Sequence, residues 1–208
     1  MSYIVVGIHT GIGKTVCSAI LTEALQCDYW KPVQAGSLRS TDTHFVKRMI
    51  DNDRSVLHDE AYRLKLAASP HYAAEFEGIE ISLNKIRLPK SENGIIVETA
   101  GGLLSPLSRR LSNLDVVKKL KLPVILVSNN YLGSINHTML TLEVLQESGA
   151  TMKGIIFWGK SFDSTREYIL KKSRLPLLLE VPYFRKLTRK TLCEFADKKG
   201  KLIRSRLS

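Results

Sequence analysis

Gly7, Gly13, Lys14 and Thr15 have the types and order of residues that hold phosphate groups. They lie in the stretch Val5–Thr15, VVGIHTGIGKT, where a short apolar run leads into a glycine-rich turn. Glycines allow a tight turn whose N–H groups point at phosphate oxygens, while a lysine adds positive charge and a threonine hydroxyl can bind Mg²⁺. A helix that begins at Lys14 would add its positive end. The stretch therefore predicts a protein that binds nucleotide phosphates.

The spacing of this turn is unusual. Phosphate-binding loops commonly have four residues between the two glycines, whereas five separate Gly7 from Gly13 here, and Ile8 holds the expected position. A plain turn between a strand and a helix is the alternative. The apolar run before the turn and the helical pattern after it favour the phosphate-binding interpretation.

Further charged residues follow other apolar runs. Lys31 begins the segment KPVQAG, Asp42 follows it, and Glu98 comes near the end of the run GIIVE. Mg²⁺ takes one or two protein carboxylates together with phosphate oxygens and water, so Thr15, Asp42 and Glu98 form a candidate metal set. Asp42 could instead cap the N-terminus of a helix, and Lys31 could be an ordinary solvated lysine.

Short apolar runs alternate with helical patterns along the chain, which predicts an α/β fold with a doubly wound, mostly parallel sheet. The ligand crevice of such a sheet lies at the carboxyl ends of its strands. We expect a single domain over residues 1–208, with residues 37–93 as its least regular part. The expected strands are 3–8, 29–32, 94–98, 123–128, 154–158 and 177–181, and the clearest helices are 15–26 and 135–146.

The net charge of +11 is concentrated near the C-terminus, where residues 160–208 hold fourteen Lys or Arg against five Asp or Glu. The basic pairs fall at helical surface spacings without interleaved aromatic residues for base stacking. Solvated helix faces are the preferred interpretation, and nucleic acid is not an expected partner.

Cys17, Cys27 and Cys193 cannot all pair and have no metal-binding spacing, which favours reduced thiols. The sequence begins with a strand pattern in place of a leader, and it has no run long enough to cross a bilayer. We therefore expect a cytoplasmic protein that does not contact membranes.

Several motifs occur in a characteristic order: GxxTxxGKT from Gly7, KPVxxG from Lys31, VExAGG from Val97, SPLS from Ser105, and LGxINH from Leu132 after the run PVILV. Together they resemble the dethiobiotin synthetases, a family with a P-loop NTPase-like topology. The resemblance extends from the N-terminus to Val181-Pro182.

The resemblance implies ring closure in biotin synthesis, in which 7,8-diaminononanoate, CO2 and ATP give dethiobiotin, ADP and phosphate. A carbamate and a carbamic-phosphoric anhydride are the implied intermediates, and Mg²⁺ is the implied cofactor. The implied partner is a second copy of the chain, with the substrate site at the interface of a homodimer. The implied catalytic residues are Lys14, Lys31 and Thr10. The implied nucleotide site consists of Gly11, Ile12, Gly13, Lys14, Thr15, Val16 and Trp158. The implied substrate site consists of Thr10, Lys31, Ala35, Gly101, Leu132, Gly133, Ser134, Ile135 and Asn136.

Some positions depart from the family pattern. Ile8, His9 and Gly11 make the loop less acidic than in many relatives, and Ala35 lacks a hydroxyl that would contact the diamine. Trp158 stands where relatives have an asparagine that bonds the adenine edge. Since an indole can stack on any base, we expect weaker discrimination between ATP and other nucleoside triphosphates.

Three other functions share some of these sequence features. An ATPase switch of the partition or cell-division-positioning type carries an extra lysine five positions before the main one, but His9 stands there. A glutamine-dependent amidating enzyme of the cobyrinate type needs a glutaminase domain, for which 208 residues leave no room. A degenerate nucleotide-binding relative without turnover is the third alternative, and it stays open because of the departures near the site. His137 could be an ordinary histidine on a helix surface or in the core. Asn136 could simply cap the helix that follows it.

Overall fold

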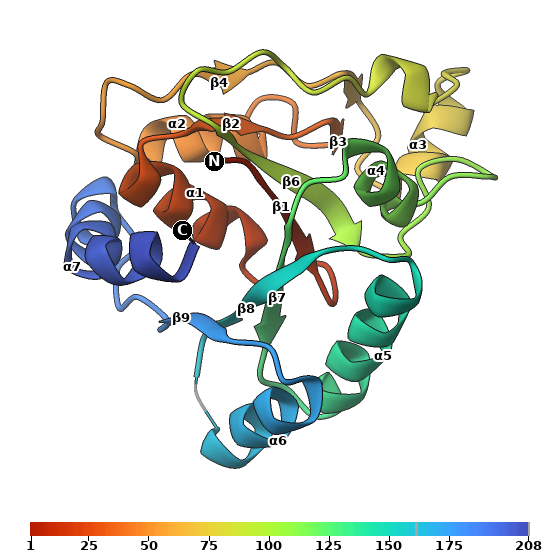
Figure 1. Ribbon diagram of the computed structural model, residues 1–208. Coiled ribbons are helices and arrows are strands. Elements are labelled where there is room, and N and C mark those ends of the chain that lie inside the picture. The colour runs from red at the N-terminus through yellow and green to blue at the C-terminus, as the bar shows by residue number, and fades with distance from the viewer. Residues whose placement is uncertain (161, 208) are drawn as a thin grey trace.

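A computed structural model describes residues 1–160 and 162–207. Its centre is a parallel sheet of seven strands in the order β4-β2-β6-β1-β7-β8-β9 (Figure 1). A smaller parallel pair, β3 and β5, stands beside it. The strands are β1 (Tyr3–Gly7), β2 (Asp28–Trp30), β3 (Val33–Ala35), β4 (Leu57–His58), β5 (Tyr62–Leu64), β6 (Ile95–Gly102), β7 (Val124–Asn129), β8 (Met152–Trp158) and β9 (Leu177–Val181).

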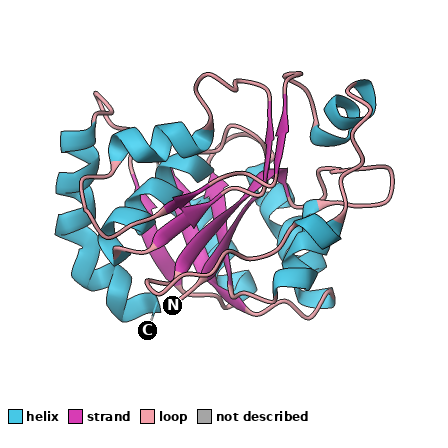
Figure 2. Ribbon diagram, turned by 90° about the horizontal axis from the view of Figure 1, so that it is seen from above, coloured by secondary structure: helices cyan, strands magenta, loops and turns pink. Residues whose placement is uncertain are grey.

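Helices cover both faces of the large sheet (Figure 2). One face packs against α1, α2 and α7, and the other against α3, α4, α5 and α6. The helices are α1 (Lys14–Leu25), α2 (Asp42–Met49), α3 (Pro70–Phe76), α4 (Asn113–Leu120), α5 (Ser134–Glu147), α6 (Asp163–Ser173) and α7 (Arg189–Leu207), with a short 3-10 turn at Leu83–Lys85. The expected doubly wound α/β fold is confirmed.

The residues of the central strands alternate between the two faces of the sheet. In β1, Ile4 and Val6 point to the α5 side, whereas Tyr3 and Val5 point to the α1 side. All four are buried, because helices cover the sheet on both sides. This double burial explains why the strands read as continuous apolar runs in the sequence.

Residues 37–93 are more regular than the sequence suggested. They contain α2, β4, β5 and α3, and the two-residue strand β4 extends the large sheet at its edge. The strand expected at 94–98 continues to Gly102, so that Glu98 lies inside β6 and not at its end. Short, partly polar strands have weak periodicity, since the side-chain alternation needs several residues to show.

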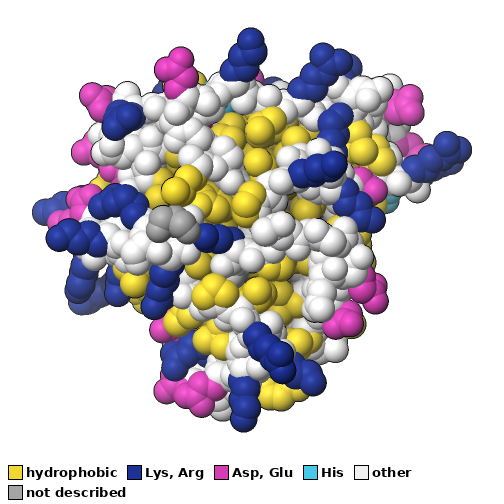
Figure 3. All heavy atoms as spheres, viewed as in Figure 1, with side chains coloured by type: hydrophobic (Ala, Val, Ile, Leu, Met, Phe, Trp, Pro, Cys, Tyr) yellow, Lys and Arg dark blue, Asp and Glu magenta, His cyan; other side chains and the backbone are white. Residues whose placement is uncertain are grey.

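Helix α7 carries much of the positive charge, and Figure 3 shows Lys and Arg side chains gathered over it, at the left of the view. Not all of these cations are merely solvated. Arg204 donates to the backbone oxygen of Ala24 at 2.6 Å, and Arg206 donates to those of Leu177 and Leu178 at 2.6 and 3.2 Å. Part of the basic excess therefore attaches α7 to the fold. Among the described helices, none combines the length and apolar character that crossing a bilayer requires.

Candidate functional site

The loop between β1 and α1 brings the Lys14 side chain back over its own backbone. A Cβ on Gly7 would lie 2.8 Å from Lys14 Cδ and 2.9 Å from its Nζ, so a larger residue here would displace the Lys14 side chain. Gly13 caps α1 with a φ of 86°, a left-handed conformation that favours glycine. The Lys14 ammonium donates to the backbone oxygen of His9 at 3.1 Å. Burial lowers the pKa of Lys14 to about 8, although Glu98 partly opposes this effect.

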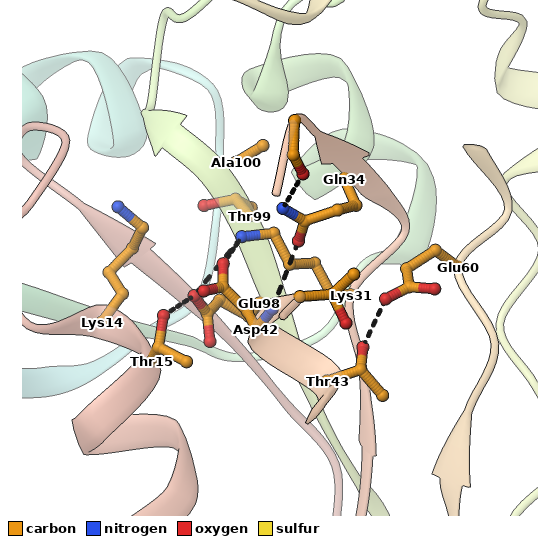
Figure 4. Close-up of polar contacts among 12 residues, drawn as sticks. Lys14, Thr15, Lys31, Gln34, Asp42, Thr43, Glu60, Glu98, Thr99 and Ala100 are labelled. Atoms are coloured by element: carbon orange, nitrogen blue, oxygen red, sulfur yellow. Dashed lines mark hydrogen bonds and ion pairs between the residues drawn. The ribbon is translucent and has the colours of Figure 1, made fainter. Parts of the chain in front are cut away.

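The second lysine lies between two carboxylates (Figure 4). Lys31 follows β2, and its Nζ bonds the Asp42 carboxylate and lies 3.7 Å from Glu98 Oε1. Burial alone would lower the pKa of Lys31, but Glu98 and Asp42 together raise it above its usual value. Lys31 is therefore a fixed ammonium, held by two carboxylates, and the alternative of a freely solvated lysine is wrong.

Each carboxylate oxygen of Glu98 accepts a hydrogen bond, although the residue is only 1 % exposed. The Thr15 hydroxyl donates to Oε1 at 2.8 Å, and the Tyr29 hydroxyl donates to Oε2 at 3.0 Å. Burial, reinforced by the Glu98 charge, raises the pKa of Tyr29 well above its usual value, so its proton stays available to Glu98. Sequence reasoning missed Tyr29, because a tyrosine in a buried strand looks like an ordinary core residue.

Asp42 is the first residue of α2 and not its cap. The cap is Thr41, whose side chain accepts from the backbone N–H of His44, while the His44 ring accepts from the N–H of Thr41. The structural alternative for Asp42 is therefore wrong. Gln34 accepts from the backbone N–H of Asp42 at 3.4 Å, which ties the start of α2 to the segment after Lys31.

These groups line one cavity of about 410 Å³. Ten of the residues predicted for the site share it: Thr10, Gly11, Gly13, Lys14, Thr15, Val16, Lys31, Asp42, Glu98 and Gly101. Three further lining residues, Ser40, Phe45 and Arg48, were not predicted. The arrangement of hydroxyl, carboxylate and ammonium groups around a glycine-rich loop can hold a phosphate chain together with a small cation.

The donor set suits Mg²⁺. Within the described residues, no group of three or more His, Cys, Asp or Glu side chains could hold a metal unaided. Mg²⁺ keeps several waters and takes phosphate oxygens along with one or two carboxylates, so Thr15, Asp42 and Glu98 fit it when a nucleotide is present. Lys31 would share the two carboxylates with the cation.

A second cavity of about 490 Å³ shares Thr10 with the first as a lining residue. Its walls are largely apolar and include Leu103, Leu140 and Val144, with His9 and His137 among the polar groups. The His9 and His137 rings are stacked, with centroids 6.4 Å apart. His137 is exposed on the surface of α5, as its plain interpretation suggested.

The other predicted residues lie outside the phosphate cavity. Ile12 is buried in the core, and Ala35 is half-buried in β3. The segment Leu132–Asn136 leads into α5, which begins at Ser134 and has Gly133 as its cap, so Asn136 is not a helix cap. None of these residues lines either cavity of the single chain.

Trp158 ends β8 and packs on the phosphate-binding loop. A Cβ on Gly13 would meet its indole at 2.3 Å. The Tyr183 ring contacts the indole edge-to-face, with centroids 5.4 Å apart. The predicted base-stacking residue thus lies directly beside the loop, and its indole is partly covered by Gly13 and Tyr183.

Comparisons with known proteins give the site its context. A family model described as an AAA domain matches residues 1–191. The ATP-dependent dethiobiotin synthetase of Christiangramia forsetii is 43% identical, over 93% of this chain and 98% of that protein. That of Cytophaga hutchinsonii is 45% identical, over 94% of this chain and 95% of that protein.

Solved structures with a similar fold are more distant in sequence. A ParA family ATPase from Chlorobium tepidum has a TM-score of 0.53 at 14% identity, covering 100% of this chain and 95% of that one. The MinC:MinD cell division complex of Aquifex aeolicus has a TM-score of 0.55 at 12% identity, covering 99% and 92%. These similarities concern the fold alone.

The hydrogen bond from Tyr29 to Glu98 predicts an effect on the Mg²⁺ requirement of nucleotide binding. Tyr29→Phe removes the donor that fixes one Glu98 oxygen, and we expect it to raise the Mg²⁺ concentration needed for half-maximal binding of a nonhydrolysable ATP analogue about 10-fold or more. Calorimetric titrations of the analogue at several Mg²⁺ concentrations measure this shift.

Tyr3→Phe is the matched control, because the Tyr3 hydroxyl donates to the backbone oxygen of Leu207, outside both cavities. The same Mg²⁺ requirement in the two variants would contradict a role for Tyr29 in orienting Glu98.

Proposed function

The chain belongs to the family of ATP-dependent dethiobiotin synthetases, and from this premise we propose that it closes the ureido ring of dethiobiotin from 7,8-diaminononanoate, CO2 and ATP. The observation that carries the proposal is the shared cavity, where Lys14, Lys31 and Glu98 meet the glycine-rich loop. The proposal treats residues 1–208 as one domain, because α7 packs on α1 and on β9. It also places the enzyme in the cytoplasm, which the free cysteines support.

The reaction has three steps, and each places negative charge near the two lysines. One substrate amine attacks CO2 and loses a proton, giving a carbamate. A carbamate oxygen then attacks the γ-phosphorus of ATP, and ADP leaves. Finally the second amine attacks the carbonyl carbon and loses a proton, the ring closes, and phosphate leaves.

The chain contributes position and charge to these steps, which is what phosphoryl transfer mainly requires. Lys14 lies against the loop and lines the cavity, where its ammonium would neutralise charge on the outer phosphates. Lys31 is an ammonium fixed by Asp42 and Glu98, so it can stabilise a carbamate without first reorganising. Thr10 borders both cavities, and its hydroxyl can orient the diamine between them.

Magnesium would be held by Thr15, Asp42 and Glu98, where it would neutralise charge on the phosphate oxygens. The apolar second cavity suits the alkyl chain of the diamine, since it adjoins Thr10 and exposes leucine side chains.

An ATPase switch is the weaker alternative. Its support is the similarity to ParA and MinD structures, which at 14% and 12% identity concerns the fold. Lys31, with its two carboxylate partners, has a chemical role in ring closure and none that we can assign in a switch.

A homodimer is part of the proposal. Leu132 is fully exposed, and Leu104 and Leu140 are each more than half exposed at the rim of the second cavity. Tyr131 joins this rim through a hydrogen bond of 2.7 Å with His137. Leu132–Asn136 lines neither cavity of its own chain, which supports a substrate site completed by this segment of a second copy.

Sedimentation equilibrium tests the dimer. We expect the wild-type chain to sediment as a dimer and Leu132→Asp combined with Leu140→Asp to sediment as a folded monomer, because two charges would be buried at the interface. Tyr168→Asp, at an exposed residue of α6, is the control and should leave the dimer intact. A monomeric wild type at micromolar concentration would exclude the shared site.

Trp158 predicts weak discrimination between ATP and other nucleoside triphosphates. Because it lacks the amide of the usual asparagine, we expect kcat/KM for GTP, CTP and UTP to lie within about 10-fold of the value for ATP, less than the discrimination that a bonded polar edge gives. Steady-state kinetics with the four triphosphates measure the ratios. A large and equal loss for all three non-adenine nucleotides would contradict the prediction.

The function itself is tested by product formation. Purified protein with diaminononanoate, bicarbonate, Mg²⁺ and ATP should give dethiobiotin detectable by mass spectrometry, and Lys14→Ala or Lys31→Ala should lower turnover at least about 100-fold. Lys171→Ala, on the exposed surface of α6, is the matched control. No product, in parallel with an active relative, would refute the proposed function.

A further inference from the structure

Arg48 is a lining residue of the phosphate cavity that the mechanism above does not use. It lies in the last turn of α2, on the same helix face as Asp42 and Phe45, because the three residues follow one another at intervals of three. All three line the cavity. Helix α2 therefore presents a carboxylate, an aromatic ring and a guanidinium in sequence along the cavity that the glycine-rich loop also lines.

Arg48 decides the net charge of the side chains that line the cavity. Lys14, Lys31 and Arg48 are its cations, and Asp42 and Glu98 are its carboxylates. Lys31 interacts with both carboxylates. Without Arg48 the lining side chains would be formally neutral, although the cavity must attract a polyanion. The lining side chains therefore carry one more positive than negative charge, and Arg48 accounts for this difference.

The guanidinium is available for a ligand. Within the described residues, no ion pair joins Arg48 to a carboxylate, and its side-chain contact is a long 3.5 Å approach to the Ser40 hydroxyl. An arginine fork matches two phosphate oxygens, so phosphate is a suitable ligand for it.

The backbone at Arg48 is held by the C-terminal helix. Arg189 of α7 donates to the Arg48 carbonyl oxygen at 2.9 Å and to the Asp51 carboxylate at 3.3 Å. The Cys193 thiol donates to the carbonyl oxygen of Met49 at 3.4 Å. Three contacts at the end of α2 thus fix the point from which the guanidinium extends toward the cavity.

We propose that Arg48 binds the phosphate chain of the nucleoside triphosphate from the α2 side of the cavity that the glycine-rich loop also lines. This proposal rests on the nucleotide-binding part of the proposed function, and it adds a binding residue that acts on the phosphates and not on the base. A role in helix stability alone is the alternative, since a cation in the last turn favours the helix dipole.

The test measures binding without turnover. Arg48→Ala should weaken binding of both the β,γ-imido analogue of ATP and inorganic tripolyphosphate by the same factor, about 10-fold or more, the size expected for a lost charge-assisted hydrogen bond. Arg48→Lys should recover only part of the affinity, because an ammonium lacks the planar fork. Isothermal titration calorimetry with Mg²⁺ gives the dissociation constants.

Lys47→Ala is the matched control. Lys47 lies in the same last turn of α2 and is exposed, but it does not line the cavity. A helix-stability role would lower the thermal midpoint of both alanine variants and leave both affinities unchanged, which would overturn the proposal. Loss of affinity for the analogue but not for tripolyphosphate would also overturn it, because the contact would then be to the nucleoside.

Different results refute the ring-closing activity and the binding of phosphate by Arg48. A wild-type protein that binds the analogue but forms no dethiobiotin refutes the ring-closing activity, while the Arg48 comparison keeps its meaning. Unchanged binding in Arg48→Ala, with normal product formation by the wild type, refutes Arg48 alone.

Discussion

The site depends on the requirement that buried charges be paired. Lys31 and Glu98 are nearly inaccessible to water, and an unpaired ion at such depth would cost several kcal/mol. Lys31 therefore needs Asp42 and Glu98, and the latter also receives hydrogen bonds from Thr15 and Tyr29. These five residues come from β2, the segment after it, α1, α2 and β6. Their mutual pairing fixes how the two helices sit over the strand ends.

The same pairing makes the cavity ready for chemistry. Ammonium and carboxylate groups that already hold one another need little rearrangement when a phosphoryl group arrives, which is the basis of electrostatic preorganisation. The same pairing makes these residues hard to replace, because removing one of them leaves its partners buried with an uncompensated charge. The catalytic groups and the packing of α2 against the sheet therefore cannot vary independently.

The sequence predicted the sheet and the phosphate-binding loop well, because long apolar runs and glycine spacing are local signals. Asp42 and Glu98 were also found, since acidic residues close to buried strands are conspicuous. Tyr29 and Arg48 were missed because a strand tyrosine and a helix-surface arginine look ordinary until the chain folds around them. The two-residue strand β4 is too short for any periodic signal, and the position of Leu132–Asn136 away from both cavities depends on tertiary geometry that no local pattern encodes.

The contacts of Arg206 have a consequence for the free edge of the sheet. Strand β9 is the last in the order, and among the residues that the structure describes no strand pairs with its outer edge. An edge strand with unoccupied carbonyl groups can recruit a strand from another molecule and begin aggregation. The guanidinium of Arg206 occupies the carbonyl oxygens of Leu177 and Leu178, so α7 closes part of this edge to further pairing. The basic C-terminal helix thus leaves less of this sheet edge free to pair with another molecule.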